Sequence, residues 1–312
     1  MTDHLLLMSA NLESHLDSLK GRCEIHRYYN APDPDALLSE IGEQVRLLGT
    51  NGHVGCPPEV MDRLPNLGLI GCYGVGYDAI DLNATRSRGI SVTNTPEVLN
   101  DAVAELALGL MFALARRIPQ SDRYVREGRW LQGEYPLTNE LTGRVAGILG
   151  MGRIGKEVAR RLQAMKMRVV YHGRRAQANE PFEYFDNLEA MAAAVDWLIV
   201  CLPGGASTDG IVSQAVLEAL GSKGQLVNVA RGSVVDQPAL VTALEQGSLG
   251  GAALDVFVDE PRVPEPLIAM DNVVLSPHAA SATHKTRHDM GELVIANLIA
   301  YLDGNPLITQ IA

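Results

Sequence analysis

The chain has 312 residues, of which 46% are hydrophobic and 20% charged, a balance typical of a globular chain of about two domains. Acidic residues outnumber basic ones by 37 to 26, and the formal net charge of −11 argues against nucleic acid as a partner. No apolar run is long enough to span a membrane, and the N-terminus lacks the pattern of a signal peptide. The four scattered cysteines favour reduced thiols in the cytoplasm, and no metal site is expected.

Residues 1–95 alternate short apolar runs with polar, helix-like segments. Strands are predicted at Leu5–Met8, Val45–Gly49, Leu67–Cys72 and Ile90–Thr93, and helices at Leu12–Leu19, Pro34–Ile41 and Pro58–Leu64. Such alternation predicts a parallel sheet with helices on both faces. Glycine-rich loops at residues 49–52 and 71–78 could hold an anion on backbone N–H groups, although either loop alone is more simply an ordinary turn.

The next segment is predicted to connect two domains. Thr95-Pro96-Glu97 is predicted to begin a helix, and the alanine- and leucine-rich segment Asp101–Arg116 predicts a long, heavily buried one. The hinge is placed near Leu99–Asp101. Residues 120–143, which include Trp130, are predicted to form an arm, for which a subunit contact and local packing are equal alternatives.

The stretch from Val145 to Arg175 has the pattern of a dinucleotide-binding unit. The apolar run Val145–Leu149 is followed by a glycine-rich turn, a helical pattern and a second strand at Arg168–Tyr171. In such units the first glycine allows a tight turn, the second lets the backbone approach a pyrophosphate, and the third lets the helix pack closely on the strand. The N-terminus of the helix then faces the phosphates. A glycine turn without a ligand is the weaker alternative, because this one lies between a strand and a helix.

The residues after the second strand bear on the choice of cofactor. NAD-binding units usually carry Asp or Glu there to bind the ribose 2′-hydroxyl, whereas this chain reads Gly173-Arg174-Arg175 and has no carboxylate before Glu180. Two guanidinium groups can grip a 2′-phosphate bidentately. Both arginines would also suit a solvated loop, but their position favours NADP.

The rest of the chain continues the alternation and adds ionisable side chains. Strands are predicted at Trp197–Leu202, Gln225–Val229, Ala252–Phe257 and Val273–Leu275, and helices at Ser213–Leu220, Gln237–Gln246 and Lys285–Leu302. Arg231, Glu260 and His278 follow predicted strands. An arginine can clamp a carboxylate, a histidine can donate a proton and an acid can orient the ring, which together suffice to reduce a 2-oxo acid. Taken singly, each residue has a simpler explanation. Arg231 would suit a surface ion pair, Glu260 a turn, and His278 a hydrogen-bonded position in the core.

Six motifs in order resemble the D-isomer-specific 2-hydroxyacid dehydrogenases over essentially the whole chain. They are GCYGVGYDAID (71–81), NTPEVLNDAVAELALGLM (94–111), GILGMGRIG (147–155), VNVARGSVVD (227–236), ALDVFVDEP (253–261) and NVVLSPHAASAT (272–283). Within that family the chain is most similar to short, NADP-using glyoxylate/hydroxypyruvate reductases.

The resemblance implies an α/β fold of two Rossmann-like, doubly wound parallel-sheet domains. Residues 1–98 and 286–312 would form a discontinuous, flavodoxin-like substrate-binding domain, and residues 99–285 the dinucleotide-binding Rossmann domain. The expected reaction is transfer of a hydride from NADPH to a small 2-oxo acid such as glyoxylate or hydroxypyruvate, which gives the D-2-hydroxy acid. A homodimer is expected, with neither nucleic acid nor a membrane as a partner.

The resemblance also implies roles for individual residues. Arg231 would clamp the substrate, Glu260 would be the partner acid and His278 the proton donor. Substrate contacts are predicted at Asn51, Gly74, Val75, Gly76 and Arg231. Cofactor contacts are predicted at Gly150, Met151, Gly152, Arg153, Ile154, Gly155, Gly173, Arg174, Arg175, Leu202, Pro203, Val229, Ala230, Asp255, His278 and Ala280.

Two features of the sequence qualify the resemblance. Ala279-Ala280-Ser281 departs from a segment in which the family commonly has a glycine. The rival class is a nucleotide-sensing binding protein such as the transcriptional corepressors of this fold, which keep the same catalytic residues. Such regulators use disordered extensions, which this sequence lacks, and oxidation of NADPH in the presence of glyoxylate would discriminate between the two.

Overall fold

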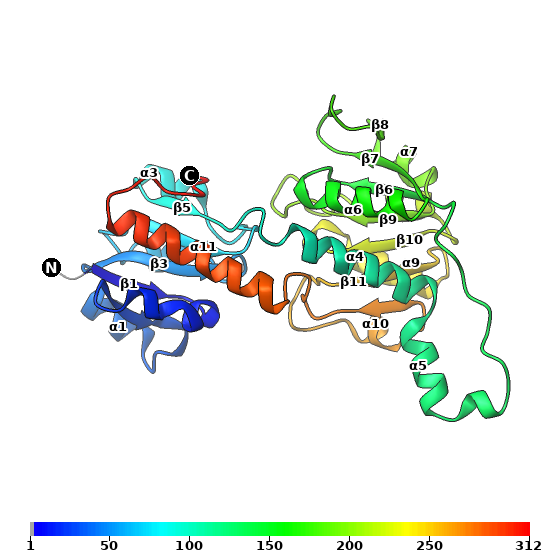
Figure 1. The fold of residues 1–312 in the computed structure, drawn as a ribbon, viewed down its shortest axis with the longest axis horizontal. Helices are drawn as coiled ribbons and strands as arrows, with labels where there is room; N and C mark the ends of the chain where they lie inside the picture. Colours follow the sequence, from blue (N-terminus) through cyan, green and yellow to red (C-terminus); the bar gives the residue numbers. More distant parts are fainter. Residues whose placement is uncertain (1–2) are drawn as a thin grey trace. The chain divides into compact units, whose positions relative to one another are not determined.

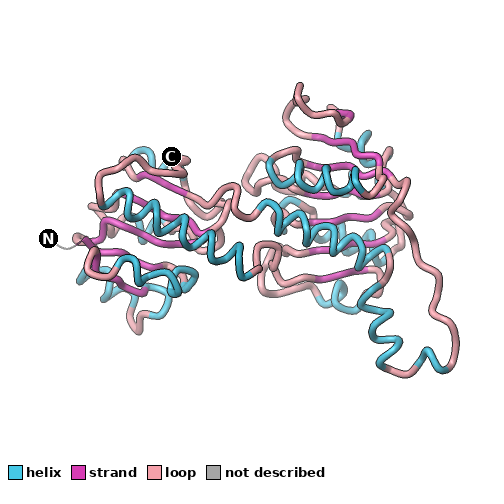
Figure 2. Tube along the Cα trace, viewed as in Figure 1, coloured by secondary structure: helices cyan, strands magenta, loops and turns pink. Residues whose placement is uncertain are grey.

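The computed structural model describes residues 3–312, which divide into two compact units (Figures 1 and 2). Unit 1 ends at Leu99 and resumes at Ala282, and unit 2 spans Asn100–Ser281. The predicted α/β class and the discontinuous first domain are therefore confirmed. No helix among the described residues is long and apolar enough to cross a membrane.

Unit 1 is built on a five-stranded parallel sheet in the order β2-β1-β3-β4-β5. The strands are β1 (Asp3–Leu7), β2 (Cys23–Arg27), β3 (Val45–Asn51), β4 (Leu69–Tyr73) and β5 (Ser91–Thr93). The helices are η1 (Ala10–Leu19), η2 (Tyr28–Asn30), α1 (Pro34–Ile41), α2 (Pro58–Met61), α3 (Leu82–Ser87) and α11 (His284–Leu302). The segment η1, predicted as a helix, is a 3-10 helix, and β2 and α3 were not predicted.

The last helix, α11, completes unit 1 by packing on its sheet (Figure 1). Small residues permit the close approach, since a Cβ on Gly71 of β4 would lie 3.0 Å from Val294 Cγ1. The fully buried side chain of Asn297 then ties down the C-terminal residues, because its Oδ1 accepts the N–H groups of Ile308 and Thr309 at 2.9 and 3.2 Å. The end of the chain thereby runs beside β5.

Unit 2 is built on a seven-stranded parallel sheet in the order β12-β11-β10-β9-β6-β7-β8. The strands are β6 (Val145–Leu149), β7 (Arg168–His172), β8 (Glu183–Phe185), β9 (Trp197–Val200), β10 (Gln225–Asn228), β11 (Gly251–Leu254) and β12 (Val273–Leu275). The helices are α4 (Asn100–Ala115), α5 (Ile118–Arg126), η3 (Arg129–Leu131), α6 (Arg153–Ala164), α7 (Leu188–Ala193), α8 (Gln214–Leu220), η4 (Gly232–Val234), α9 (Gln237–Glu245) and α10 (Glu265–Ala269). Because β6 lies between β7 and β9, the strand order reverses there, and such a switch point is where sheets of this type bind their ligands.

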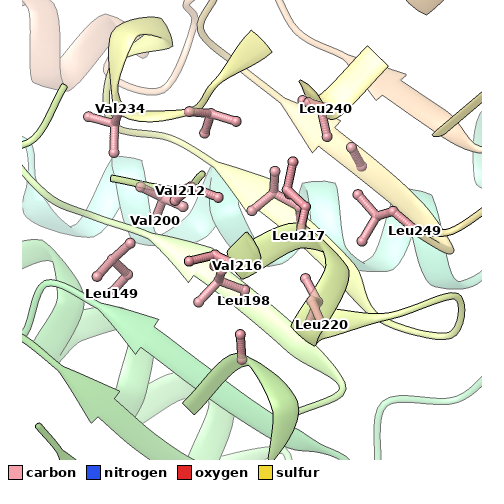
Figure 3. Packing of buried hydrophobic residues seen from close by; sticks show 14 of the residues in the cluster. Leu149, Leu198, Val200, Val212, Val216, Leu217, Leu220, Val234, Leu240 and Leu249 are labelled. Atoms are coloured by element: carbon pink, nitrogen blue, oxygen red, sulfur yellow. The ribbon is translucent and has the colours of Figure 1, made fainter. Parts of the chain in front are cut away.

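The core of unit 2 explains why its strands are continuous apolar runs. In β9, Leu198 and Val200 are fully buried and pack with Val216 and Leu217 of α8 (Figure 3). A parallel sheet covered by helices on both faces buries successive residues of each strand, whichever side they face. Each such side chain contributes about 1.5–3 kcal/mol by leaving water.

One predicted element is wrong, and several short ones were not predicted. Thr95-Pro96-Glu97 does not begin a helix: α4 begins at Asn100, and Glu97 has a left-handed φ of 71°, which interrupts helical geometry. Pro119 lies in the first turn of α5. The short elements β8, α7 and α10 were also missed, because each has at most six residues and no repeated pattern.

Candidate active site

The glycine-rich turn joins the end of β6 to the start of α6, at the switch point of the sheet in unit 2. Gly150 has a φ of +102°, a conformation that strongly favours glycine, and a Cβ there would lie 2.9 Å from Leu202 Cδ2. A Cβ on Gly155 would clash with the carbonyl oxygen of Gly150, so this glycine lets α6 pack closely. A Cβ on Gly152 would meet nothing within 4 Å and would occupy open space at the start of α6. The turn thus offers an open cradle beside a helix N-terminus.

The next loop along this edge follows β7 and carries two exposed arginines, Arg174 and Arg175. In the described part of the chain, neither guanidinium has an ion-pair partner. The carboxylate that follows them, Glu180, is instead bound to Lys156 of α6 at 2.9 Å and is largely buried. NAD-binding units carry a carboxylate at this position, which binds the ribose hydroxyl. In this chain the loop presents positive charge there instead.

The other predicted cofactor contacts of unit 2 follow the ends of its remaining strands. Leu202 and Pro203 come shortly after β9, Val229 and Ala230 after β10, and Asp255 directly after β11. Because the strands are parallel, these positions share one edge of the sheet. On the same edge, burial raises the pKa of Cys201 to about 12, so this thiol stays protonated and is not a nucleophile at neutral pH.

Asp255 has a structural role that the sequence did not reveal: it organises the loop that carries His278. Its fully buried carboxylate accepts hydrogen bonds from the Ser276 hydroxyl at 2.5 Å and from the N–H groups of Ala279 and Ala280 at 2.8 and 3.0 Å. The backbone N–H of His278 donates to the Asp255 carbonyl at 2.8 Å. His278 itself has a φ of 51°, a strained conformation for a residue with a Cβ. Ser276, a polar residue directly after a strand, was the available signal.

His278 and Glu260 are brought into direct contact. The Nδ1 of His278 lies 2.8 Å from Glu260 Oε2, while Glu260 Oε1 accepts the N–H of Phe257 at 3.0 Å. The two side chains are 30% and 20% exposed, so the pair is sheltered but reachable. A carboxylate bonded to Nδ1 fixes the orientation of the ring.

Arg231 follows β10, and the neighbouring residue Asn228 shapes its backbone. The Asn228 side chain donates to the Arg231 carbonyl at 2.9 Å and accepts the N–H of Ala230 at 3.0 Å. One guanidinium nitrogen of Arg231 donates to the Ala230 carbonyl at 2.7 Å. Because β10, β11 and β12 are adjacent strands, Arg231, Glu260 and His278 all come from loops at one edge of the sheet. Asn228 was not among the predicted site residues, although it is the second residue of the VNVARGSVVD motif.

The predicted substrate contacts of unit 1 lie in two loops after β3 and β4. The Asn51 side chain is occupied within its own loop, where Oδ1 accepts the N–H groups of His53 and Val54, both at 2.9 Å. Gly74 has a φ of +142°, and its N–H donates to Thr95 Oγ1 at 3.1 Å. By contrast, the N–H groups of Val75 and Gly76 have no acceptor within residues 3–312. This loop therefore offers backbone donors for an anion.

The Rossmann sheet, its glycine turn at the switch point and the carboxylate–histidine pair define a dinucleotide-dependent oxidoreductase. Comparison with known proteins identifies the family of oxidoreductases. A family model described as the D-isomer specific 2-hydroxyacid dehydrogenase, NAD binding domain, matches residues 108–280. The chain belongs to this family, as its motifs predicted.

Relatives of known activity cover nearly the whole chain. Glyoxylate/hydroxypyruvate reductase A of Arabidopsis thaliana is 41% identical and matches 98% of both chains. Hydroxyphenylpyruvate reductase of Plectranthus scutellarioides is 42% identical and matches 97% of this chain and 96% of its own. The crystal structure of an NADPH-dependent glyoxylate/hydroxypyruvate reductase from Sinorhizobium meliloti, in complex with NADP and malonate, is 41% identical with a TM-score of 0.93, over 100% of this chain and 97% of its own.

Proposed function

We propose that this protein reduces a small 2-oxo acid of the glyoxylate or hydroxypyruvate type to the D-2-hydroxy acid, with NADPH as the reductant. The observation that carries the proposal is the 2.8 Å hydrogen bond between His278 Nδ1 and Glu260 Oε2. Bound NADPH supplies the hydride. The protein must then supply a proton and a fixed positive charge for the carbonyl oxygen.

The side chains of unit 2 suit these tasks. With Nδ1 bonded to Glu260, His278 uses Nε2 to give its proton to the substrate oxygen. Arg231 carries a permanent charge on a planar fork, which can bind the substrate carboxylate and polarise the neighbouring carbonyl. Asp255 acts on this chemistry indirectly, by holding the loop on which His278 stands.

The cofactor site fits NADPH by two features of the fold. The open position at Gly152, next to the N-terminus of α6, leaves room for a pyrophosphate against free backbone N–H groups. Arg174 and Arg175 lack carboxylate partners in the described residues, so they can bind a 2′-phosphate without first breaking an ion pair. The remaining predicted contacts, from Leu202 to Ala280, would surround the rest of the dinucleotide.

In unit 1, the predicted anion-binding groups are backbone N–H groups of the loop after β4. The N–H groups of Val75 and Gly76 would bind a carboxylate, since neither has an acceptor within residues 3–312. Gly74 and Asn51 would shape the two loops through their internal hydrogen bonds, rather than bind substrate through those groups.

Steady-state kinetics test the proposed reaction. Glyoxylate, hydroxypyruvate and hydroxyphenylpyruvate would each be tested with NADPH and with NADH. We expect the two smaller acids with NADPH to give the highest kcat/KM, and His278→Ala to lose about 10²–10⁴ in kcat, the usual contribution of a positioned acid. Absence of NADPH oxidation with every acid would overturn the proposal in favour of the corepressor-like binding protein, which the activities of the relatives do not favour.

We further propose that the protein is a cytoplasmic homodimer. Apolar side chains are exposed along α5 and the segment after it, including Trp130 at 67%, Leu131 at 94% and Leu137 at 100%. Large exposed apolar side chains gathered in one segment are typical of a subunit contact, and two-fold symmetry is the commonest arrangement. Four free cysteines suit a reducing compartment. Analytical ultracentrifugation should give twice the chain mass of 33.6 kDa, and a single species of 33.6 kDa would contradict the dimer.

A further inference from the structure

Three side chains suited to binding a metal ion lie together at the outer edge of the sheet in unit 1. His4 belongs to β1, and Glu24 and His26 belong to the edge strand β2. In the parallel register His4 lies beside Glu24, and Leu6 beside His26. Residues that pair across a sheet, and residues two apart in one strand, point to the same face. The strand pairing therefore brings two imidazoles and a carboxylate onto one surface.

The donor atoms are close enough to share one ion. His26 Nε2 lies 3.0 Å from His4 Nδ1 and 3.8 Å from Glu24 Oε1. One donor atom can be chosen from each residue such that all three lie within 4.8 Å of one another. In tetrahedral zinc coordination, bonds of about 2.0–2.1 Å place neighbouring ligand atoms roughly 3.3 Å apart. The two distances from His26 lie on either side of that value.

The environment of the three residues favours a cation over an ordinary ion pair. The imidazole side chains are only 16% and 13% exposed, whereas Glu24 is 61% exposed and faces the solvent from which a metal would enter. Without a metal, the two rings can share one N–H between two nitrogens, and they lie stacked with centroids 4.9 Å apart.

We propose that His4, Glu24 and His26 form a binding site for a divalent transition-metal ion of the zinc type. Two imidazole nitrogens and one carboxylate oxygen match the ligands that Zn²⁺, Ni²⁺ and Cu²⁺ prefer, whereas Ca²⁺ and Mg²⁺ require oxygen ligands. A bound ion would link the edge strand β2 to β1. Because the site requires both strands to be paired, the ion binds the folded state and stabilises it.

A second cluster in unit 1 provides the matched control. His15, His288 and Glu292 also have donor atoms within 4.8 Å of one another, but the rings of His15 and His288 are 5.4 Å apart and Ser14 Oγ lies 3.0 Å from His15 Nδ1. A His288→Gln variant removes one histidine from this second cluster and leaves the edge-strand cluster untouched. It therefore separates binding at the proposed site from binding at this second cluster.

The test is a Zn²⁺ titration of the tag-free, chelator-treated full chain by isothermal calorimetry, with thermal unfolding measured in parallel. We expect saturable binding that includes this site and raises the unfolding midpoint, with affinity about tenfold or more lower in His26→Gln. Glu24→Gln, a change at an exposed side chain, should weaken binding in the same direction, and His288→Gln should retain the site. Circular dichroism verifies that the variants are folded. Absence of saturable Zn²⁺ binding by the wild type, or a Zn²⁺ affinity in His26→Gln equal to that of the wild type, would overturn the proposal.

Discussion

Replacement of Asp255 by asparagine should loosen the loop that carries His278, although the two side chains have nearly the same shape. The carboxylate takes three hydrogen bonds in a fully buried position, from Ser276, Ala279 and Ala280. An amide keeps one acceptor oxygen and presents its N–H₂ group where the second oxygen had been. The hydroxyl of Ser276 can rotate to accept, but a backbone N–H cannot. In either orientation of the amide, one backbone N–H faces another donor.

The expected loss follows from the number of bonds. A hydrogen bond to a charged acceptor contributes about 1.5–3 kcal/mol, and a buried donor left unpaired costs about 1–3 kcal/mol. Asp255→Asn should therefore destabilise the loop by about 2.5–6 kcal/mol. That loop also holds His278 in its left-handed conformation, which costs about 1–2 kcal/mol. With the anchor weakened, His278 should leave its position, and a displacement of about 1 Å can cost roughly 10²-fold in rate.

Two measurements check this reasoning. Hydrogen exchange followed by mass spectrometry should show faster exchange in the peptide that contains Ala279 and Ala280, and kcat for NADPH oxidation with glyoxylate should fall about 10–100-fold. Ser276→Ala, which removes one donor and leaves no backbone N–H unpaired, should have a smaller effect. Asp259→Asn, which alters an exposed pair with Arg262, should change neither quantity. Wild-type exchange and wild-type kcat in Asp255→Asn would refute the proposed anchoring.

Three further outcomes are expected. Glu260→Gln exchanges the carboxylate that holds the His278 ring for an amide, so kcat should fall, though by less than in His278→Ala; an unchanged kcat would show that the pairing has no catalytic role. Arg231→Lys should mainly raise the KM for the 2-oxo acid, because a point charge cannot reproduce the guanidinium fork; an unchanged KM argues against the clamp. Replacing Arg174 and Arg175 together with Ala should reduce the preference for NADPH by about tenfold, since contacts to phosphate are worth about 1.5–3 kcal/mol each before discount for solvent. A retained preference in this double variant would exclude these arginines as the phosphate site.

The features predicted best from the sequence are those encoded within a short segment. The strand, glycine turn and helix around Gly150 occupy consecutive residues, and the conformation of Gly150 and the packing of Gly155 agree with the roles predicted for a tight turn and for close packing. The arginines after β7 could likewise be recognised by their distance from that turn. A local pattern of this kind needs no knowledge of distant contacts.

Features that depend on distant residues could not be predicted in this way. Asp255 was recognised within a motif, but its partners lie more than twenty residues later, and the sequence does not show which oxygen meets which N–H. The strand β2 is short and polar, with the sequence CEIHR, because it forms an edge of the sheet and needs no continuous apolar run. The juxtaposition of His4 and His26 follows from the pairing of β2 with β1, so it could not be predicted from the sequence either.

The discontinuity of unit 1 sets the order in which the chain can fold during synthesis. The strands of its sheet emerge first, but α11 emerges only after all of residues 100–281 have been made. At about 5–20 residues per second, the face of the sheet that α11 covers waits roughly ten to forty seconds for its partner. Unit 2, whose residues are continuous, meets no such delay. The newly made protein is therefore most exposed to aggregation through the sheet of unit 1, and that period ends when α11 docks on β4 and Asn297 ties down the final residues.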